Sequence, residues 1–326
     1  MVIKKIKKYN IFIVGGAGFI GSNVANFFSN LKNVKKIIIY DNFSSGRKWF
    51  LKKSKKFLII DRDIKDYNSL KKSMKICNFV FHFAANPDLA ASVNNPDIDF
   101  QEGTVLFRNV IEAMKENNIK NIIYASGSGV YGDKQNKILF EDKTVTQPIS
   151  TYGSSKLYCE NLISSYSNLY DFTGISFRFA NVVGENATHG VCYDFVRKIF
   201  QNNKQIKILG NGKQSKSYIH VSDVVLAIYK SFKKKKSPGH SVYNLSTKDN
   251  ITVDRILNII LKIMKIKKIK KIYTGSKRGW KGDVPIVRIN DSKFRRYYNW
   301  ENKFSSYEAI RKTILFLINN KKRYNF

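Results

Sequence analysis

The chain has few of the residues that mark secreted, metal-binding or membrane proteins. Of its 326 residues only three are cysteine and four are histidine, and neither set has metal-ligand spacing. No apolar run approaches the roughly 18 residues that a membrane span needs, and the stretch after the N-terminal lysines is too short for a signal peptide core. These absences predict a soluble cytoplasmic protein with reduced thiols, no metal and no membrane partner.

Acidic residues are also scarce, because 24 Asp and Glu stand against 58 Lys and Arg, for a formal net charge of +34. Such an excess raises the question of nucleic-acid binding. The lysine clusters lie throughout the chain, however, and no RNA-binding module accompanies them. They read KKIKK near the start, KKSKK at 52–56, KKKK at 233–236 and KIKKIKK at 265–271. We therefore expect no nucleic-acid partner, and expect the charge to attract a polyanionic substrate.

The segment NIFIVGGAGFIG at 10–21 is the most informative stretch of the chain. A short apolar run predicts a buried strand, and helical character follows from Ser22. Gly15 allows a tight turn out of the strand, Gly18 lets backbone N–H groups approach a pyrophosphate, and Gly21 lets the helix pack closely on the sheet. The helix N-terminus then offers N–H groups and a positive dipole end to the phosphates.

An acidic residue about 20 positions further on makes this glycine pattern specific. Asp41 ends a second apolar run, KIIIY at 36–40, and is followed by Asn42. A carboxylate there accepts hydrogen bonds from both adenosine ribose hydroxyls and repels a 2′-phosphate. The sequence therefore predicts NAD as the cofactor, in preference to NADP.

Strand-like and helical patterns alternate over the first half of the chain. The strands are expected at 11–14, 36–40, 57–60, 79–83, 121–125 and 175–179, with helices such as 107–117 and 154–169 between them. This alternation predicts an α/β fold with a doubly wound parallel sheet of the Rossmann type. We assign residues 1–181 to the NAD-binding domain and 182–326 mainly to a smaller, interleaved substrate lobe. Segments near 220–245 are expected to return to the main domain.

Tyr152 and Lys156 lie four residues apart in STYGSSK, at the start of a helical segment. This spacing places both side chains on one face of a helix. A nearby ammonium favours the phenolate and so lowers the pKa of a tyrosine. Tyr152 is therefore predicted to be a general base toward a substrate hydroxyl. Both residues are also expected to contact the cofactor.

Together these motifs resemble the extended short-chain dehydrogenase/reductases, in the group of nucleotide-sugar epimerases and dehydratases, along nearly the whole chain. The resemblance implies that GGAGFIG is the cofactor loop, including Phe19 and Ile20. It further implies cofactor contacts from DRDI at 61–64 and FHFAANPD at 81–88, through Asp63, Ile64, Ala84 and Ala85. It implies substrate contacts from RFANVVG, THGV, LGNGKQSKSYIHVSD and RGWKGDV, through Asn181, His189, Lys216 and Arg278. The NPD and THGV segments are most similar to the UDP-glucose 4-epimerase type.

The chain departs from the family pattern close to the base. A catalytic serine or threonine usually stands four residues before the tyrosine of VYG, where this chain has Gly127. Ser126 or Ser128, which flank it, is expected to supply the missing hydroxyl. The phosphate-contacting arginine is replaced by Lys216, which keeps the charge without the bidentate fork.

The same region bears on the reaction. Dehydratases of this family carry an Asp-Glu pair just before VYG, where this chain has Ser128 and Gly129. We therefore expect an NAD-dependent 4-epimerase acting on a UDP-hexose, which oxidises C4 to a 4-keto sugar and reduces it on the opposite face. The alternatives are a 4,6-dehydratase with an acid supplied from elsewhere, a C4 dehydrogenase, or a catalytically silent NAD-binding scaffold.

The resemblance also implies a homodimer. Extended members of the family often pair through the two helices at 107–117 and 154–169. The second helix carries Leu157, Leu162, Ile163 and Tyr166, which are more apolar residues than one sheet-facing stripe requires. We expect them to form part of a twofold interface.

Overall fold

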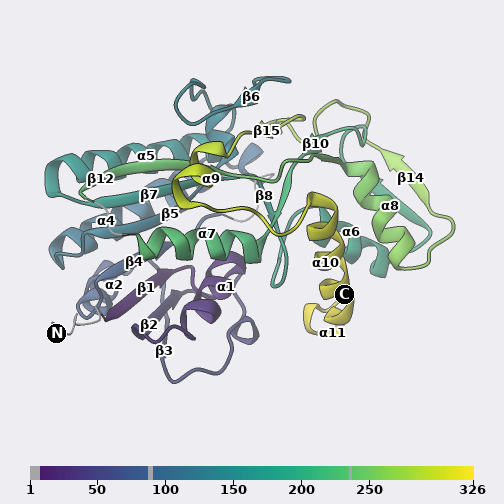
Figure 1. Cartoon of the computed structure of the whole chain (residues 1–326). Helices are drawn as coiled ribbons and strands as arrows, with labels where there is room; N and C mark the ends of the chain where they lie inside the picture. The colour runs from purple at the N-terminus through teal and green to yellow at the C-terminus, as the bar shows by residue number, and fades with distance from the viewer. Residues whose placement is uncertain (1–7, 87–90, 235–236) are drawn as a thin grey trace.

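A computed structural model describes residues 8–86, 91–234 and 237–326. A seven-stranded parallel sheet forms its larger part, in the order β12-β7-β5-β4-β1-β2-β3 (Figure 1). The first four strands along the chain are β1 (Tyr9–Val14), β2 (Val34–Asp41), β3 (Phe57–Asp61) and β4 (Phe79–His82). The others are β5 (Asn121–Gly127), β7 (Thr173–Phe179) and β12 (Gly239–Leu245). The doubly wound Rossmann-type sheet predicted from the sequence is confirmed.

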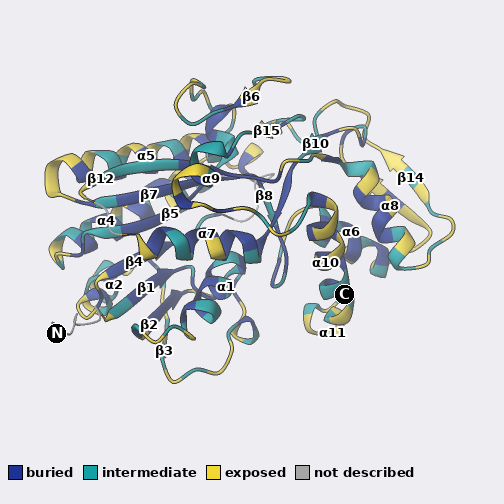
Figure 2. Cartoon of the chain, viewed as in Figure 1, coloured by how far each residue is buried: buried dark blue, intermediate teal, exposed yellow. Residues whose placement is uncertain are grey.

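Helices cover both faces of this sheet because successive strand residues point to opposite sides. Ile11 and Ile13 of β1 pack with α1 (Phe19–Phe28), α7 (Val221–Lys233) and α9 (Ser292–Tyr298). Phe12 and Val14 pack on the other face with α2 (Tyr67–Met74), α4 (Leu106–Glu116) and α5 (Thr151–Tyr170). The central strands are therefore buried on both faces (Figure 2).

A smaller lobe with its own apolar core lies beside the sheet, on the right in Figure 1. It contains α6 (Val191–Gln201), α8 (Val253–Ile263), α10 (Ser306–Asn319) and α11 (Lys321–Tyr324), with the paired strands β9 (Gln205–Ile208) and β14 (Lys270–Tyr273). Short strand pairs connect the remaining segments: β8 (Asn181–Val183) with β11 (Tyr218–His220), β10 (Ser215–Lys216) with β13 (Ile251–Thr252), and β6 (Ile138–Leu139) with β15 (Arg288–Ile289). The division of the chain at residue 181 stays a prediction.

Short helical segments surround the ends of the central strands. They are η1 (Lys48–Phe50), η2 (Ala91–Val93), α3 (Asp97–Asp99), η4 (Ser128–Tyr131) and a π-helical turn, η3 (Phe100–Val105), which leads into α4. The π-helical turn packs against α5, where Gly103 lies so close to Ser155 that a Cβ would come 2.6 Å from its Oγ.

Helix α5 accounts within one chain for the apolar residues that were expected to form a dimer interface. Ile163 and Tyr166 are buried in the core between α5, α4 and the sheet, and Leu162 packs against the same core. Leu157 packs against a separate cluster around Tyr131. The fold of the single chain therefore already covers Ile163 and Tyr166, whereas Leu157 and Leu162 are half-buried, and the homodimer stays a prediction.

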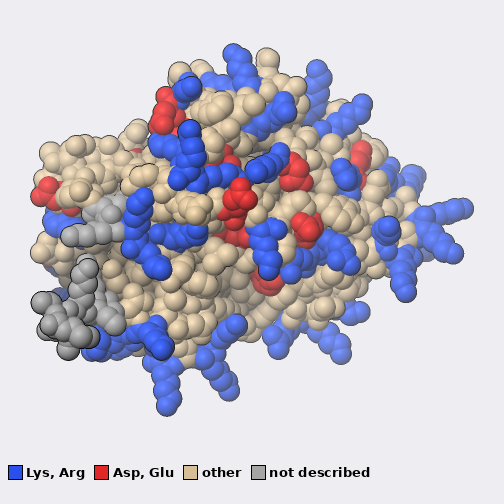
Figure 3. Space-filling model, in the orientation of Figure 1, with Lys and Arg blue, Asp and Glu red and all other residues tan. Residues whose placement is uncertain are grey.

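The basic side chains are spread over the surface. Figure 3 shows Lys and Arg scattered over much of the visible face, and no single patch on this face gathers them. Pro87 and Asp88 of the NPD segment, most of the N-terminal lysine cluster and the last two lysines of KKKK at 233–236 lie outside the described residues. Over the part of the chain that is described, no helix combines the length and the apolar character needed to cross a bilayer.

Candidate active site

The carboxyl ends of the parallel strands open into a cavity of about 1000 Å³, which residues of the smaller lobe also line. Ligands of open α/β sheets bind at this edge, where the strand order reverses between β1 and β4. Almost all of the predicted site residues line the cavity: Gly15, Gly18, Phe19, Ile20, Gly21, Asp41, Asn42, Asp63, Ile64, Ala84, Ala85, Ser126, Ser128, Tyr152, Lys156, Asn181, His189 and Lys216. Arg278 lies outside this lining.

The glycine loop makes contacts that only glycine permits. Gly15 has a φ of +71°, and a Cβ on it would lie 2.6 Å from the backbone nitrogen of Ala84. A Cβ on Gly21 would lie 2.1 Å from the carbonyl oxygen of Gly15. No side chain caps the N-terminus of α1, and its first turn has no acidic residue. The loop and this helix end therefore form a cradle that fits a dinucleotide pyrophosphate.

Asp41 is held at the end of β2 by the loop itself. Its two carboxylate oxygens accept hydrogen bonds from the backbone nitrogens of Ala17 and Phe43, both at 2.8 Å. Burial raises the pKa of Asp41 from its ordinary value, and the backbone donors oppose that shift. Nearby, Asn42 donates to Asp63 at 2.9 Å, so the expected ribose-contacting and adenine-contacting segments touch one another.

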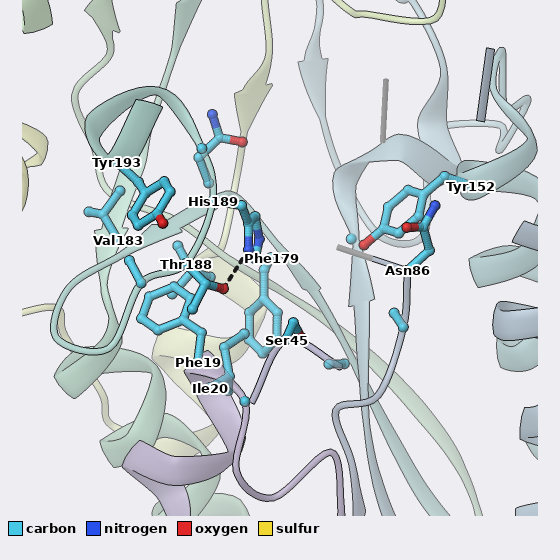
Figure 4. Close-up of a pocket in the computed structure, with 18 of the residues that line it drawn as sticks. Phe19, Ile20, Ser45, Asn86, Tyr152, Phe179, Val183, Thr188, His189 and Tyr193 are labelled. Carbon is cyan, nitrogen blue, oxygen red and sulfur yellow. Dashed lines mark hydrogen bonds between the residues drawn. The ribbon is translucent and has the colours of Figure 1, made fainter. Parts of the chain in front are cut away.

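Tyr152 and Lys156 lie in the first two turns of α5. The helix begins at Thr151, before the predicted 154, because Ser150 caps it by accepting a hydrogen bond from the Gly153 nitrogen. The Nζ of Lys156 donates to the Ala125 carbonyl at 2.8 Å and lies 5.4 Å from the centre of the Tyr152 ring. In Figure 4 Tyr152 lies beside Asn86, across from Phe19, Ile20 and His189.

The protein's own groups do not lower the pKa of Tyr152, contrary to the sequence-based expectation. Burial raises that pKa to about 12, and the Asp99 carboxylate adds to the increase. Burial also lowers the pKa of Lys156 to about 8, so the ammonium is itself destabilised. The expectation neglected desolvation of the phenol, which is the largest cause of the shift.

The two serines that flank Gly127 have different surroundings. Ser126 is buried, and its Oγ donates to Glu160 at 2.5 Å. Glu160 is also paired with Arg178, at 2.7 Å, beneath the cavity. Ser128 begins the next helical turn, is half-buried and carries no such bond. A Cβ on Gly127 would lie 4.0 Å from the Tyr152 hydroxyl, in otherwise open space.

The two cations that were expected to contact the substrate each pair with a carboxylate. Lys216 donates to Asp283 at 2.5 Å, and the other oxygen of Asp283 accepts from the Gly279 nitrogen at 2.9 Å. Arg278 pairs instead with Asp133 at 2.8 Å, on the loop after VYG. Lys216 therefore lines the cavity while it is paired with Asp283, whereas the guanidinium of Arg278 is directed to Asp133.

Sequence reasoning missed many residues of the cavity wall, among them Arg47 and Trp280. The backbone nitrogen of Arg47 donates to Ala17 at 3.1 Å, which brings a guanidinium-bearing residue beside the glycine loop. Trp280 packs on Gly282, where a Cβ would come 2.3 Å from the indole. In the sequence, Arg47 is marked only as a basic residue that follows the SSG segment at 44–46. Trp280 is marked only as an aromatic residue within RGWKGDV.

We expect the protein to bind NAD at least about tenfold more tightly than NADP, because repulsion between the Asp41 carboxylate and a neighbouring 2′-phosphate is worth about 1.4 kcal/mol or more. Titration calorimetry with each cofactor measures the ratio. Asp41→Asn should reduce the preference for NAD over NADP. The amide of this variant has one oxygen, so it can accept only one of the two hydrogen bonds from the Ala17 and Phe43 nitrogens. Equal or tighter binding of NADP to the native protein would contradict the role of Asp41.

Ser126→Ala and Ser128→Ala should affect different properties. Loss of the hydrogen bond to the buried Glu160 carboxylate should destabilise the Ser126 variant by roughly 1.5–3 kcal/mol, which thermal unfolding measures. Ser128→Ala should leave the unfolding temperature nearly unchanged and lower kcat more than Ser126→Ala does. If Ser126→Ala lowers kcat more at unchanged stability, the hydroxyl near the reacting oxygen belongs to Ser126.

Comparison with known proteins agrees with this geometry. Residues 11–246 match the model of the NAD dependent epimerase/dehydratase family. A putative UDP-glucose 4-epimerase of Methanocaldococcus jannaschii is 28% identical over 317 residues, which cover 96% of this chain and 99% of the relative. A UDP-glucuronate 4-epimerase of Thermodesulfobacterium geofontis is 29% identical over 93% of this chain and 94% of its own.

A crystal structure of a UDP-galactose 4-epimerase superposes with a TM-score of 0.84 at 32% identity, covering 95% of this chain and 99% of that one. The match extends over the sheet, the smaller lobe and the cavity between them. The chain belongs to the NAD-dependent epimerase/dehydratase family.

Proposed function

We propose that the protein is an NAD-dependent nucleotide-sugar 4-epimerase. The observation that carries the proposal is that Tyr152 and Lys156 line the same cavity as the glycine cradle, with Lys216 on the side of the smaller lobe. This arrangement provides a base next to a hydride acceptor and an anchor for a diphosphate. The relatives are named as epimerases of UDP-glucose and UDP-glucuronate, so a UDP-sugar is the expected substrate class.

In the proposed reaction, Tyr152 accepts the proton of the sugar 4-hydroxyl as C4 is oxidised, and returns it after the sugar has turned over in the cavity. NAD, when bound, supplies reversible hydride transfer at C4. The hydroxyl of Ser128 is proposed to donate a hydrogen bond to the reacting oxygen. Asn181 and Lys216 are proposed to hold the diphosphate, with Asp283 keeping Lys216 in place.

The walls near the base support epimerisation over dehydration. A dehydratase needs a carboxylic acid to protonate and deprotonate the sugar beyond C4, and Ser128 and Gly129 occupy that place. Asp99, the buried acid that raises the pKa of Tyr152, is hydrogen-bonded to Thr151 and lies outside the cavity lining. Glu102 lines the cavity but pairs with Lys65. A 4,6-dehydratase would require an acid that is free to reach the sugar, and none of these positions provides one.

Incubation with a panel of UDP-hexoses, UDP-uronates and UDP-N-acetylhexosamines, followed by NMR of the products, tests the proposal. We expect one of these three classes of UDP-sugar to be converted to its C4 epimer, and the product to have the same mass as the substrate. Tyr152→Phe removes the proton acceptor and keeps the ring, so turnover should fall by about 10² to 10⁴ while NAD binding is retained. A 4-keto-6-deoxy product, or near-full activity of Tyr152→Phe, would contradict the proposed reaction.

We also propose a twofold homodimer in the cytoplasm. What supports the dimer is the exposure of the large side chains Tyr158, Leu169 and Tyr170 on α5. Light scattering at micromolar concentration should give a molar mass twice that of one chain. The Tyr158→Lys variant should give a lower molar mass under the same conditions. Lys75→Glu, on an exposed turn away from α5, serves as the control. A monomer of the native protein at that concentration would contradict the dimer.

A further inference from the structure

The short helix α11 connects the two lobes through aromatic side chains. Tyr324 lies edge-on against Trp49, with ring centres 5.2 Å apart, and its ring centre is 6.2 Å from that of Phe50. The Arg323 guanidinium lies 5.4 Å from the centre of the Trp49 ring. Trp49 and Phe50 belong to η1 in the larger lobe, whereas α11 follows α10 in the smaller lobe. The two lobes are therefore in direct contact at this point.

The same group of rings continues onto α6. Tyr324 stacks on Phe326 at 5.2 Å and lies edge-on against Tyr193 of α6 at 5.7 Å. Phe326 in turn stacks on Phe200, near the other end of α6, at 6.1 Å. Aromatic rings at such spacings attract one another in addition to the effect of the area that they bury. We refer to Trp49, Tyr193, Tyr324 and Phe326 as the aromatic clasp.

The aromatic clasp holds a segment that lies at the predicted cofactor site. Trp49 closely follows Arg47, whose backbone nitrogen donates to the Ala17 carbonyl of the glycine loop at 3.1 Å. Arg47, Trp49 and Tyr324 line the same cavity as Asp41. Figure 4 shows Tyr193 on the side of the cavity opposite Tyr152, so the aromatic clasp is separate from the base.

The two ends of η1 are held from different directions. The Phe50 carbonyl accepts hydrogen bonds from Asn26 of α1 at 2.8 Å and from Asn186 at 3.4 Å, and Phe50 is 3% exposed. Arg47, by contrast, is exposed, and Trp49 is half-buried. Contacts with α11 cover the Trp49 ring from the smaller lobe. The part of this segment that faces the cavity therefore depends on α11.

The Tyr324 hydroxyl gives the closed clasp a cost. It is buried, and no residue that the structure describes forms a hydrogen bond with it. Burial raises the pKa of Tyr324, and the positive charge of Arg47 opposes that rise, so the two side chains are neighbours. A buried hydroxyl without a partner is unfavourable, and water can satisfy it once Tyr324 moves away from Trp49. The contact between the lobes is therefore one that can open.

We propose that Tyr324 and Trp49 are positioning residues that retain the cofactor, and that the cofactor is released when these two rings separate. This inference rests on the proposed function, because an epimerisation returns the hydride to the sugar that lost it. The reduced cofactor must then stay bound until the sugar has turned over. Loops that enclose a bound ligand commonly set the rate of its release. Here α11 holds such a segment from the opposite lobe.

Release of NADH, measured without any sugar, tests the inference separately from the proposed reaction. Protein loaded with NADH is mixed with excess NAD⁺, and the change in NADH fluorescence gives the dissociation rate. Tyr324→Ala loses the contacts with Trp49 and Tyr193, so it should release NADH about tenfold faster than the native protein. Tyr324→Phe keeps the ring without the unsatisfied hydroxyl, so it should release NADH about fivefold more slowly.

Tyr307→Ala is the matched control, because Tyr307 is an exposed tyrosine of α10 that does not line the cavity. It should release NADH at the native rate. A native rate in Tyr324→Ala, or a rate in Tyr324→Phe equal to or above the native one, would overturn the inference. If Tyr324→Ala does not fold, Tyr324→Leu takes its place, since leucine keeps an apolar side chain without the aromatic edge.

A double-mutant cycle distinguishes the aromatic clasp from a general loosening of the fold. Trp49→Ala and Tyr324→Ala should each accelerate release, and the double variant should release NADH no faster than the faster single variant, because both changes break one contact. Thermal unfolding of the cofactor-free variants measures their stability. Multiplied effects in the double variant, or release rates that merely follow the unfolding temperatures, would show that the two rings do not act as a clasp.

Discussion

The ion pair between Glu160 and Arg178 connects the site to the fold. Glu160 projects from α5, two turns after Tyr152, and Arg178 projects from β7, so the pair joins the helix that carries the base to the sheet. Ser126 of β5 donates to the same carboxylate, and the Arg178 guanidinium lies 4.8 Å from the centre of the Tyr131 ring. Removing one partner of such a buried pair typically costs 3–5 kcal/mol, because the other charge remains unpaired. The position of α5 on the sheet therefore depends on this pair.

Local patterns were sufficient to predict the sheet and the cofactor cradle. The runs at 11–14 and 36–40 are apolar and β-branched, and Gly15 and Gly21 stand where the chain must turn and pack closely. Each of these features is determined by residues close together in the sequence. The pairing of Tyr152 with Lys156 was predictable for the same reason, since one helix turn separates them.

Features that depend on distant residues could not be read from the sequence. The partners Asp99 and Thr151 are 52 residues apart, Lys216 and Asp283 are 67 apart, and Arg278 and Asp133 are 145 apart. The raised pKa of Tyr152 depends on how much protein surrounds the phenol, which no spacing rule reports. The burial of Ile163 and Tyr166 likewise depends on where α4 lies. Sequence reasoning therefore predicted residues most of which line one cavity, but it did not predict their electrostatic environment.

The place of β12 in the sheet has a consequence for synthesis of the chain. β12 pairs along the full length of β7, but the whole segment 180–238 separates the two strands in sequence. Until β12 is synthesised, β7 can pair with β5 on one side only, so its other edge is open, and such edges are sites of aggregation. The smaller lobe is partly made before the sheet of the larger one is complete. The nascent chain therefore passes through a stage in which this edge of the sheet is exposed. Folding without aggregation depends on how quickly residues 239–245 leave the ribosome and pair with β7.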